Sequence, residues 1–439
     1  MRLLVSLLLL ALSGCAVVDS HHLIARELSR QLAPSTPAPE MTPALRQAAF
    51  DQVWTTLRDY YVDPKLHGLD WKAVRARYQP LALDAASDEA FWKTLNRMAG
   101  ELNDAHTRVE TPAQYAEIRQ QQAAGLGIGV QIIDGHFVIR GVSPVTQAAL
   151  FGVRAGDQLE QIDGETADAW WQRTLANTRG GSTPWTRTIY AERELNAPTL
   201  GKTRTLALRR PDGSRYQVTL RNEESEAPPW LIHHKLANGV VYLRFSGFER
   251  GLRQRLMDQL DKATDAPGVI IDLRSNGGGD AAMAMDLLGR FVSTPQAGGH
   301  VITRNGGSVR LLGFSLWDAD PVLQPVGKTV TAPLAILTDM RSASASELVA
   351  GAAQAIGRAQ VFGATSCGCL LGFMGYDPLP GGGALAYSEI DMTLPGGKRI
   401  EGVGVIPDQT AIPTAQDIER HNDVALNAAL AWLATQKPR

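Results

Sequence analysis

Three serines alternate with alanines where an apolar run gives way to a helical pattern: Ser342, Ser344 and Ser346, within Leu337–Gln354. A serine hydroxyl becomes a nucleophile when a base takes its proton and N–H donors stabilise the resulting oxyanion. A sharp strand-to-helix turn can supply this geometry, because the first N–H groups of a helix are unpaired and its dipole favours negative charge. Each of the three serines could be the nucleophile, and Ser346 could equally be only the N-cap of the helix.

A glycine-rich loop, Arg274–Asp280, directly follows a predicted strand, as the serine turn does. It follows a predicted buried strand at Ile270–Leu273, and the serine turn follows another at Leu334–Thr338. From Trp230 onward strands alternate with helices, which predicts an α/β sheet with parallel strands. Since active groups in such sheets gather at the carboxyl ends of the strands, we expect the two loops to meet there.

Two further parts must position these loops. Residues 41–120 show apolar side chains at helical spacing, as at Phe50, Val53, Trp54 and Leu57. Residues 121–225 change to the alternating pattern of strands. The sequence therefore predicts a multidomain α+β protein: a helical domain over 41–120, a β domain over 121–225, and an α/β core with a mixed sheet over 226–432.

The N-terminus predicts export. Arg2 precedes an apolar run, Leu3–Leu12, that is too short to span a bilayer and is typical of a signal peptide over residues 1–14. The ending Leu12–Cys15 resembles a bacterial lipoprotein cleavage box, which implies a lipid on Cys15 and a Pro-rich tether over 15–40. We expect a lipid anchor at the periplasmic face of a bacterial membrane, with Ala16 favouring the outer membrane. The alternative is a plain signal peptide with a chance cysteine.

Composition excludes some classes of function. A net charge of -2 gives no basic surface for nucleic acid, and 44% hydrophobic residues suit a globular core. Only Cys367 and Cys369 remain after Cys15; a bridge across one residue would be strained, and two thiols alone make a poor metal site. The sequence thus predicts two small loop residues, no metal and no cofactor.

The β region resembles a PDZ domain. Its opening residues Gly125, Leu126, Gly127 and Ile128 are similar to that family's carboxylate-binding loop. Consecutive backbone N–H groups there would hold a peptide C-terminus, and the peptide would add as a strand to the sheet edge. Residues 183–201 are longer than the pattern needs, and we interpret them as an insertion of unknown role.

The motifs together resemble the tricorn and C-terminal-processing family of serine peptidases. "DLRSNGGG", "SASASELVAGA" and "EGVGVIPD" carry the resemblance, which covers nearly all of the chain after the tether. It implies that Ser344 is the nucleophile and that the backbones of Gly278 and Ala345 form the oxyanion hole. Ser346 and Glu347 would open the helix as a cap and a favourable first-turn charge.

The base distinguishes two branches of that family. Processing peptidases use a lysine, but Cys369 stands in the corresponding position here. Tricorn-like members carry a histidine in a segment such as L-x-D-x-H-T, which Leu102–Thr107 matches. The resemblance therefore implies His106 as general base, a role that suits an imidazole near neutral pH. The alternative is that His106 only caps carbonyls at a helix end.

A third group would orient the imidazole. Tricorn-like enzymes use a serine beside the histidine, backed by a glutamate, but Ala105 occupies the adjacent position. Glu401 is the first candidate for the orienting carboxylate and Asp104 the second. Glu401 could instead simply pair with Arg399.

The sequence thus predicts a lipid-anchored periplasmic serine endopeptidase. It would cleave peptides or unfolded proteins through an acyl-enzyme on Ser344, with His106 as base and no nucleic-acid partner. One alternative is a catalytically degenerate peptidase fold that binds peptide C-termini through its PDZ domain. Another keeps the enzyme but uses a thiolate at Cys369.

Overall fold

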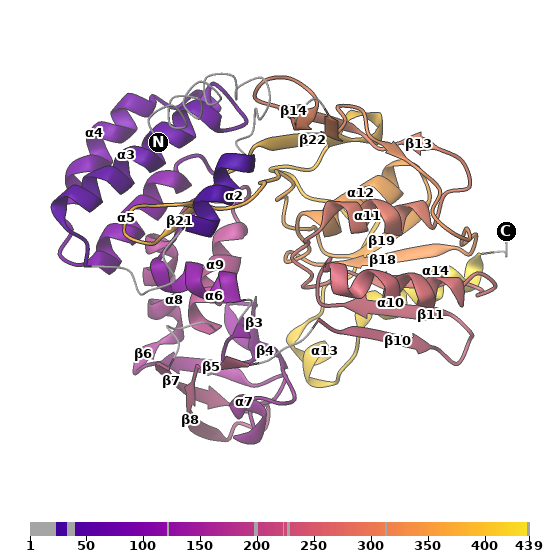
Figure 1. Cartoon of the computed structure of the whole chain (residues 1–439). Helices are drawn as coiled ribbons and strands as arrows, with labels where there is room; N and C mark the ends of the chain where they lie inside the picture. Colours follow the sequence, from indigo (N-terminus) through magenta and orange to yellow (C-terminus); the bar gives the residue numbers. More distant parts are fainter. Residues whose placement is uncertain are drawn as a thin grey trace.

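The computed structural model describes residues 23–32, 40–120, 123–196, 201–222, 224–225, 229–311 and 314–436. The predicted signal peptide and Cys15 lie outside these residues. Within this part of the chain, no helix combines the length and apolarity needed to cross a bilayer. Helices and strands form three groups around separate clusters of buried side chains (Figure 1).

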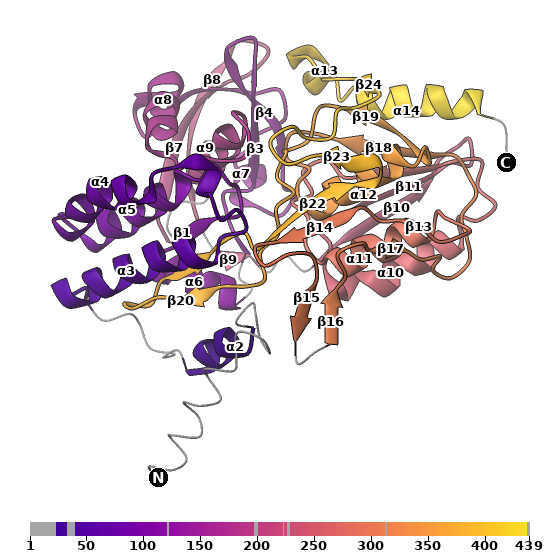
Figure 2. The ribbon, with the colours of Figure 1, turned by 90° about the horizontal axis from the view of Figure 1, so that it is seen from above.

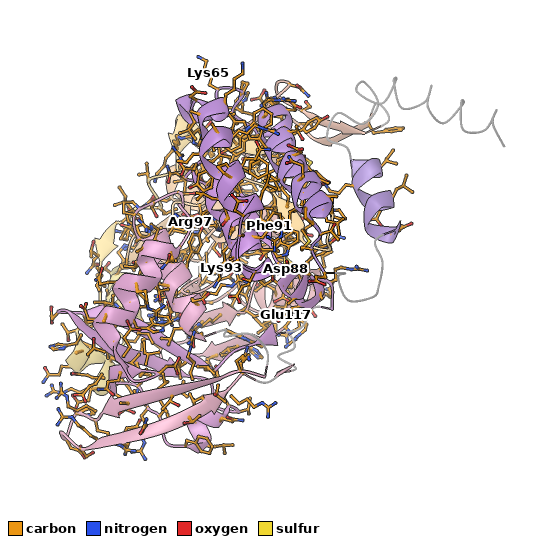
Figure 3. The ribbon with its side chains drawn as sticks, turned by 90° about the vertical axis from the view of Figure 1, so that its left-hand side faces the viewer. Lys65, Asp88, Phe91, Lys93, Arg97 and Glu117 are labelled. Atoms are coloured by element: carbon orange, nitrogen blue, oxygen red, sulfur yellow. A yellow bond between two sulfur atoms is a disulfide. The ribbon has the colours of Figure 1, made fainter. Side chains whose placement is uncertain are left out.

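The first group is built on three helices, α3 (Pro43–Tyr60), α4 (Trp71–Leu83) and α5 (Asp88–Gly100), and each follows a residue whose side chain accepts a first-turn N–H: Thr42, Asp70 and Ser87. Their apolar faces meet in one cluster that includes Phe50, which is fully buried. Figure 3 looks onto this side of the molecule and labels Phe91 on the third of these helices. The other elements of this group are η1 (Leu66–Gly68), β1 (Arg108–Glu110) and α6 (Pro112–Gln120).

The second group, which we call the β domain, is an antiparallel sheet in the order β3-β4-β5-β7-β8, with β6 pairing β5. The strand β3 lies at the edge of this sheet. The elements are β2 (Ala123–Ala124), β3 (Ile128–Ile133), β4 (His136–Val142), α7 (Gln147–Leu150), β5 (Gln158–Ile162), β6 (Glu165–Thr166), α8 (Ala167–Asn177), α9 (Thr186–Asn196), β7 (Thr203–Arg209), β8 (Arg215–Arg221) and β9 (Glu224–Ser225).

The third group, the α/β core, is a mixed sheet in the order β10-β11-β12-β18-β19-β24. Its first pair is antiparallel and the others are parallel. These strands are β10 (Leu231–Lys235), β11 (Val241–Phe245), β12 (Val269–Asp272), β18 (Leu334–Thr338), β19 (Ala359–Gly363) and β24 (Gln409–Thr410).

Helices cover both faces of this sheet. Ile271 and Ile336 pack in one cluster with α10 (Arg250–Asp261), α11 (Ala281–Gly289) and α12 (Ala345–Ala355). Their neighbours along the strands pack on the opposite face against α14 (Val424–Thr435), because successive strand residues point to opposite faces. The remaining elements are β13 (Gln296–Ala297), β14 (His300–Thr303), β15 (Val309–Leu311), β16 (Phe314–Trp317), β17 (Val322–Leu323), β20 (Asp377–Pro378), β21 (Ala384–Ala386), β22 (Ile390–Leu394), η2 (Pro395–Gly397), β23 (Lys398–Arg399) and α13 (Ala415–Glu419).

A long excursion of the core joins it to the helices. After β19 the chain leaves the sheet and β21 pairs antiparallel with β1, with Val109 opposite Leu385. In Figure 1, β21 is drawn in orange among the indigo and purple helices. Leu385 and Tyr387 are buried in the same cluster as the side chains of α3, α4 and α5. The segment that carries His106, directly before β1, is therefore fixed against the core.

Part of the predicted tether is a docked helix instead. Residues Leu23–Leu32 form α2, which lies apart from the other helices in Figure 2. Its Arg26 is buried and forms ion pairs with Asp377 at 2.5 Å and with Glu389 at 3.0 Å. A buried charge is stable only when it is paired, so these carboxylates hold the helix on the core excursion. The prediction of a flexible tether over 15–40 is wrong for this stretch.

Candidate active site

Ser344 lies at a sharp turn between β18 and α12. Its backbone has φ 56° and ψ -118°, a conformation that non-glycine residues rarely adopt and that neighbouring contacts must hold. Its N–H donates to the carbonyl of Cys369 at 3.1 Å and to the carboxylate of Glu347 at 3.0 Å. Glu347 therefore acts in the first turn as the sequence predicted, by accepting from the N-cap backbone.

The other two serines are structural. Ser342 Oγ accepts from the N–H of Asp339 and donates to the carbonyl of Leu273 at 2.8 Å. Ser346 Oγ donates to the carbonyl of Asn276 at 2.9 Å. Both residues are fully buried, whereas Ser344 is half-buried. Ser344 is thus the serine that a substrate can reach.

The cap of helix α12 is Ser344 and not Ser346, so that prediction is wrong. Ser346 is the second helical residue, and its hydroxyl ties the helix to the glycine loop instead. Local sequence could not separate the two assignments, because both positions allow a capping serine.

The two residues predicted to donate to the oxyanion, Ala345 and Gly278, lie side by side but differ in how their N–H groups are paired. Ala345 is the first residue of α12, where an N–H has no partner within the helix. The Gly278 backbone lies against it, since a Cβ built on Gly278 would be 2.7 Å from Ser344 Cβ and 2.8 Å from Ala345 N. However, the Gly278 N–H donates to Asn276 Oδ1 at 3.0 Å. The Gly278 N–H can stabilise an oxyanion only if it shares or breaks its hydrogen bond with Asn276.

Replacing Gly278 by alanine tests the close approach. Its φ of +94° disfavours a side chain, and the new Cβ would lie 2.6 Å from the carbonyl of Ala343. We expect the variant to lose about 1–3 kcal/mol of unfolding free energy and about 100-fold or more in kcat/KM. The control is Gly277→Ala, whose Cβ meets no atom within 4 Å and which we expect to unfold at the wild-type denaturant concentration. Equal kinetics for Gly278→Ala and wild type would contradict this arrangement.

The His106 turn is shaped by a buried carboxylate. Asp104 is fully buried and accepts from the His106 N–H at 2.8 Å and from the Thr107 hydroxyl. Arg179, from the β domain, donates to the carbonyls of Asp104 at 3.0 Å and Ala105 at 2.7 Å. Asp104 thus holds the backbone of the turn. Its hydrogen bonds go to the His106 N–H and the Thr107 hydroxyl, and not to the imidazole as the second prediction for the orienting carboxylate required.

The imidazole of His106 is kept neutral. Burial is the main reason that its pKa is lowered to about 4; the charge of Asp104 opposes this shift, and the charges of Arg108 and Arg179 add to it. Within the described residues its Nδ1 is buried and has no hydrogen-bond partner. A neutral imidazole at pH 7 can accept a proton, so the ring is prepared for general-base work. The ring does not cap a helix, since α5 ends at Gly100.

One short stretch of the core contacts both the Ser344 turn and the His106 ring. At its start, the Cys369 carbonyl accepts from the Ser344 N–H. Four residues later, the ring of Phe373 lies 5.8 Å from the His106 ring, measured between centroids. Ser344 and His106 are 238 residues apart in sequence, yet each has a contact within Cys369–Phe373.

Glu401 binds the same stretch. Its Oε2 accepts from the N–H groups of Leu370 at 2.6 Å and Leu371 at 3.0 Å. Burial, together with the charge of Asp104, raises its pKa to about 8. Arg399 pairs with Asp391 at 2.8 Å, so the alternative of a Glu401–Arg399 pair is not observed.

The shifted pKa of Glu401 predicts a pH-dependent stability. Because the folded state binds this proton more tightly than the unfolded state, the stabilisation is complete below the ordinary pKa and is lost as pH rises toward about 8. Relative to Glu401→Gln, wild type should lose a few kcal/mol of unfolding free energy between pH 5 and 8. Denaturant unfolding at both pH values measures this. The exposed Glu419→Gln is the control, and parallel curves for Glu401→Gln and wild type would disprove the assignment.

A serine that the sequence analysis missed lies between Glu401 and the His106 turn. Ser182 Oγ accepts from the Ala105 N–H at 3.0 Å, and its hydrogen bond to Glu401 lowers the pKa of that carboxyl. The signal in the sequence was the preceding pair Gly180–Gly181. A Cβ on Gly180 would lie 2.3 Å from the carbonyl of Gly100, so only glycine permits this approach.

The two cysteines form a disulfide, which the sequence analysis did not expect. The loop is held by Glu347, whose carboxylate accepts from Gly368 N at 2.7 Å and Cys369 N at 2.8 Å. Gly368 has φ +71°, a conformation that glycine adopts readily and that turns the chain back within one residue. A bridged Cys369 carries no thiolate, which removes it as a base in this structure.

The predicted peptide-binding loop is covered by the chain itself. The N–H of Leu126 donates to the carbonyl of Asn196, the last residue of α9, at 2.8 Å. On the adjoining edge of β3, Val130 N–H donates to Glu192 and its carbonyl accepts from Arg341 at 2.9 Å. The insertion of unknown role thus supplies α9, and the groups of Gly125–Ile128 and β3 that would bind a peptide are in part already paired.

Comparison with known protein families gives matches for two regions of the chain. Residues 239–411 match the model of peptidase family S41, and residues 43–100 match the model of the tricorn protease C1 domain. Ser344, Glu401 and the glycine loop all lie within the residues that match the S41 model. The C1 match covers the helices that precede His106.

Relatives extend over most of the chain. A carboxyl-terminal-processing protease of Picosynechococcus sp. is 26% identical over 371 residues, which cover 82% of this chain and 81% of that protein. The putative tricorn protease homolog 2 of Streptomyces coelicolor is 26% identical over 430 residues, which cover 91% of this chain and 33% of that protein. The solved photosystem II D1 C-terminal processing protease has a TM-score of 0.55 at 20% identity, covers 84% of this chain and 94% of its own, and shows the same fold.

Proposed function

We propose that this chain, which is a serine-type peptidase, cleaves peptides or unfolded proteins through an acyl-enzyme on Ser344 with His106 as general base. The observation that carries the proposal is the shared contact of the Ser344 turn and the His106 ring with Cys369–Phe373. In this proposal His106 is the base, in place of the lysine that the processing branch uses and that this chain lacks.

The geometry supports a complete reaction. Ser344 Oγ attacks the peptide carbonyl while His106 takes its proton, and the oxyanion that forms accepts from Ala345 N–H. The imidazolium then gives the proton to the leaving amine, and the acyl-enzyme remains. A water, deprotonated by the same imidazole, hydrolyses the ester and restores the serine hydroxyl.

Further observations support the proposed substrate and location. Relatives are named for processing carboxyl termini, which favours unstructured protein ends as substrates. The β domain is PDZ-like in our proposal, and it would act on such ends only after α9 leaves the β3 edge. The lipoprotein box at Cys15 supports anchoring at the periplasmic face of a membrane.

The competing function is a degenerate peptidase that only binds peptides. The paired state of Leu126 and Val130 argues against it, because a binding protein needs an available edge. The half-buried Ser344, by contrast, is available to substrate.

A fluorophosphonate label tests the proposed function. We expect it to modify the wild-type protein, and trypsin would release the modified serine in the fragment 342–358, which holds all three serines. Fragmentation by mass spectrometry should place the adduct on Ser344. No adduct, together with no cleavage of unfolded casein, would favour the binding protein instead.

A further inference from the structure

The segment Arg179–Trp185, here called the bracing segment, connects α8 to α9 and touches both halves of the proposed catalytic site. Toward the His106 turn, the guanidinium of Arg179 binds the carbonyls of Asp104 and Ala105. Beside it, Ser182 Oγ accepts from the N–H of Ala105 at 3.0 Å. The peptide unit between Asp104 and Ala105 is therefore held on both its N–H and its carbonyl sides from one segment.

On its other side the bracing segment binds the loop that supports the nucleophile. Thr183 Oγ1 donates to the Cys367 carbonyl at 2.8 Å, and Trp185 Nε1 donates to the Ser366 carbonyl at 3.1 Å. The hydroxyl of Ser182 forms its second hydrogen bond with Glu401, whose carboxylate holds Leu370 and Leu371. The segment thus lies between the histidine turn and the serine turn.

We propose that Ser182 is a positioning residue for catalysis. Its hydroxyl links the main chain before His106 to the Glu401 carboxylate, and so fixes how the imidazole faces Ser344. It supplies from the bracing segment the hydroxyl that Ala105 lacks beside the histidine. This inference rests on the proposed function, because positioning has meaning only if His106 acts on Ser344.

A hydroxyl suits this place better than a packing side chain. It accepts from the Ala105 N–H and donates to Glu401 at once, whereas alanine would leave the partly buried Ala105 N–H without a partner and would remove one of the donors to the Glu401 carboxyl group. The titratable groups around the turn are Asp104, Arg108, Arg179 and Glu401, and the pKa of the nearby Tyr61 is raised by burial and by the two acidic residues. Loss of the Ser182 hydrogen bonds would change the electrostatic effect of these groups on the His106 imidazole.

The test compares Ser182→Ala with Ser182→Thr, which keeps the hydroxyl. We expect Ser182→Ala to lower kcat about 10- to 100-fold with KM nearly unchanged, and Ser182→Thr to restore most of it. Thr178→Val is the control, because its hydroxyl bonds to the Leu175 carbonyl within α8 and reaches neither Glu401 nor the His106 turn. Wild-type kcat for Ser182→Ala, or equal losses for the alanine and threonine variants, would overturn the proposal.

A second measurement does not depend on turnover. In protein carrying Ser344→Ala, the ring-nitrogen NMR signals of His106 should titrate at a different pH when Ser182→Ala is added. An unchanged titration would overturn the proposal, even if Ser182→Ala were inactive through poor folding. If wild type itself neither labels at Ser344 nor cleaves peptide, the proposed function fails. If wild type is active and Ser182→Ala matches it, only the role of Ser182 fails.

Discussion

Ser344→Ala is expected to lower kcat/KM by about 10⁴-fold or more, with KM changed little. The hydroxyl is the group that forms the acyl-enzyme, and no other serine in the turn can replace it. Ser342 and Ser346 are buried with their hydroxyls bound to carbonyl oxygens. Hydrolysis of a fluorogenic peptide measures the loss, with circular dichroism confirming that the variant is folded.

The matched control is Ser342→Ala. It leaves the Asp339 N–H without a partner and removes one of the two donors to the Leu273 carbonyl, so we expect about 1–3 kcal/mol less unfolding free energy. The folded fraction should nevertheless keep most of its activity per molecule. Loss of fluorophosphonate labelling in Ser342→Ala but not in Ser344→Ala would exchange the two assignments.

His106→Ala is expected to lower kcat by about 10²- to 10⁴-fold, the usual range for loss of a general base. The pH profile gives an independent check. Because burial lowers the pKa of His106 to about 4, the imidazole stays neutral well below the usual 6.5. The acidic limb of kcat/KM that reports His106 should therefore lie nearer pH 4 than pH 6.5, and it should vanish in His106→Ala.

A suitable control is His300→Ala. His300 lies on β14, far along the chain from the turn, and its exposed ring pairs with Asp320. We expect its kinetics and pH profile to match wild type. An acidic limb near pH 6.5 that persists in His106→Ala would assign the base to another group.

Local patterns predicted the parts of the site that local structure forms. Ser344, Ala345 and Glu347 sit where a strand becomes a helix, and short-range spacing defines that turn. His106 was predicted through a six-residue motif rather than through any visible contact. The parallel strands also follow from the alternation of strand and helix patterns.

Contacts between distant segments could not be predicted in this way. Ser182 reaches Ala105 and Glu401 across 77 and more residues, and nothing in its own neighbourhood except two glycines marks it. The same holds for Arg26 of α2, which pairs with carboxylates more than 350 residues away. These are long-range ion pairs and hydrogen bonds, and periodicity carries no information about them.

The disulfide and the covered edge of β3 were not predicted, for a different reason. The expectation for Cys367 and Cys369 came from general geometry and ignored a glycine that can turn the chain between them. The expectation for Gly125–Ile128 came from a motif that describes a free sheet edge. Helix α9, which covers that edge, arises from the segment whose role the sequence left open.

A double-mutant cycle between Ser344 and His106 tests most directly whether the two residues work as one unit. Residues that share a catalytic step lose their effects together, so Ser344→Ala combined with His106→Ala should be no slower than Ser344→Ala alone. That result would establish that the helical domain and the core build a single site. Losses that multiply, with the double variant slower by the product of both factors, would show that His106 acts apart from Ser344 and would contradict the mechanism.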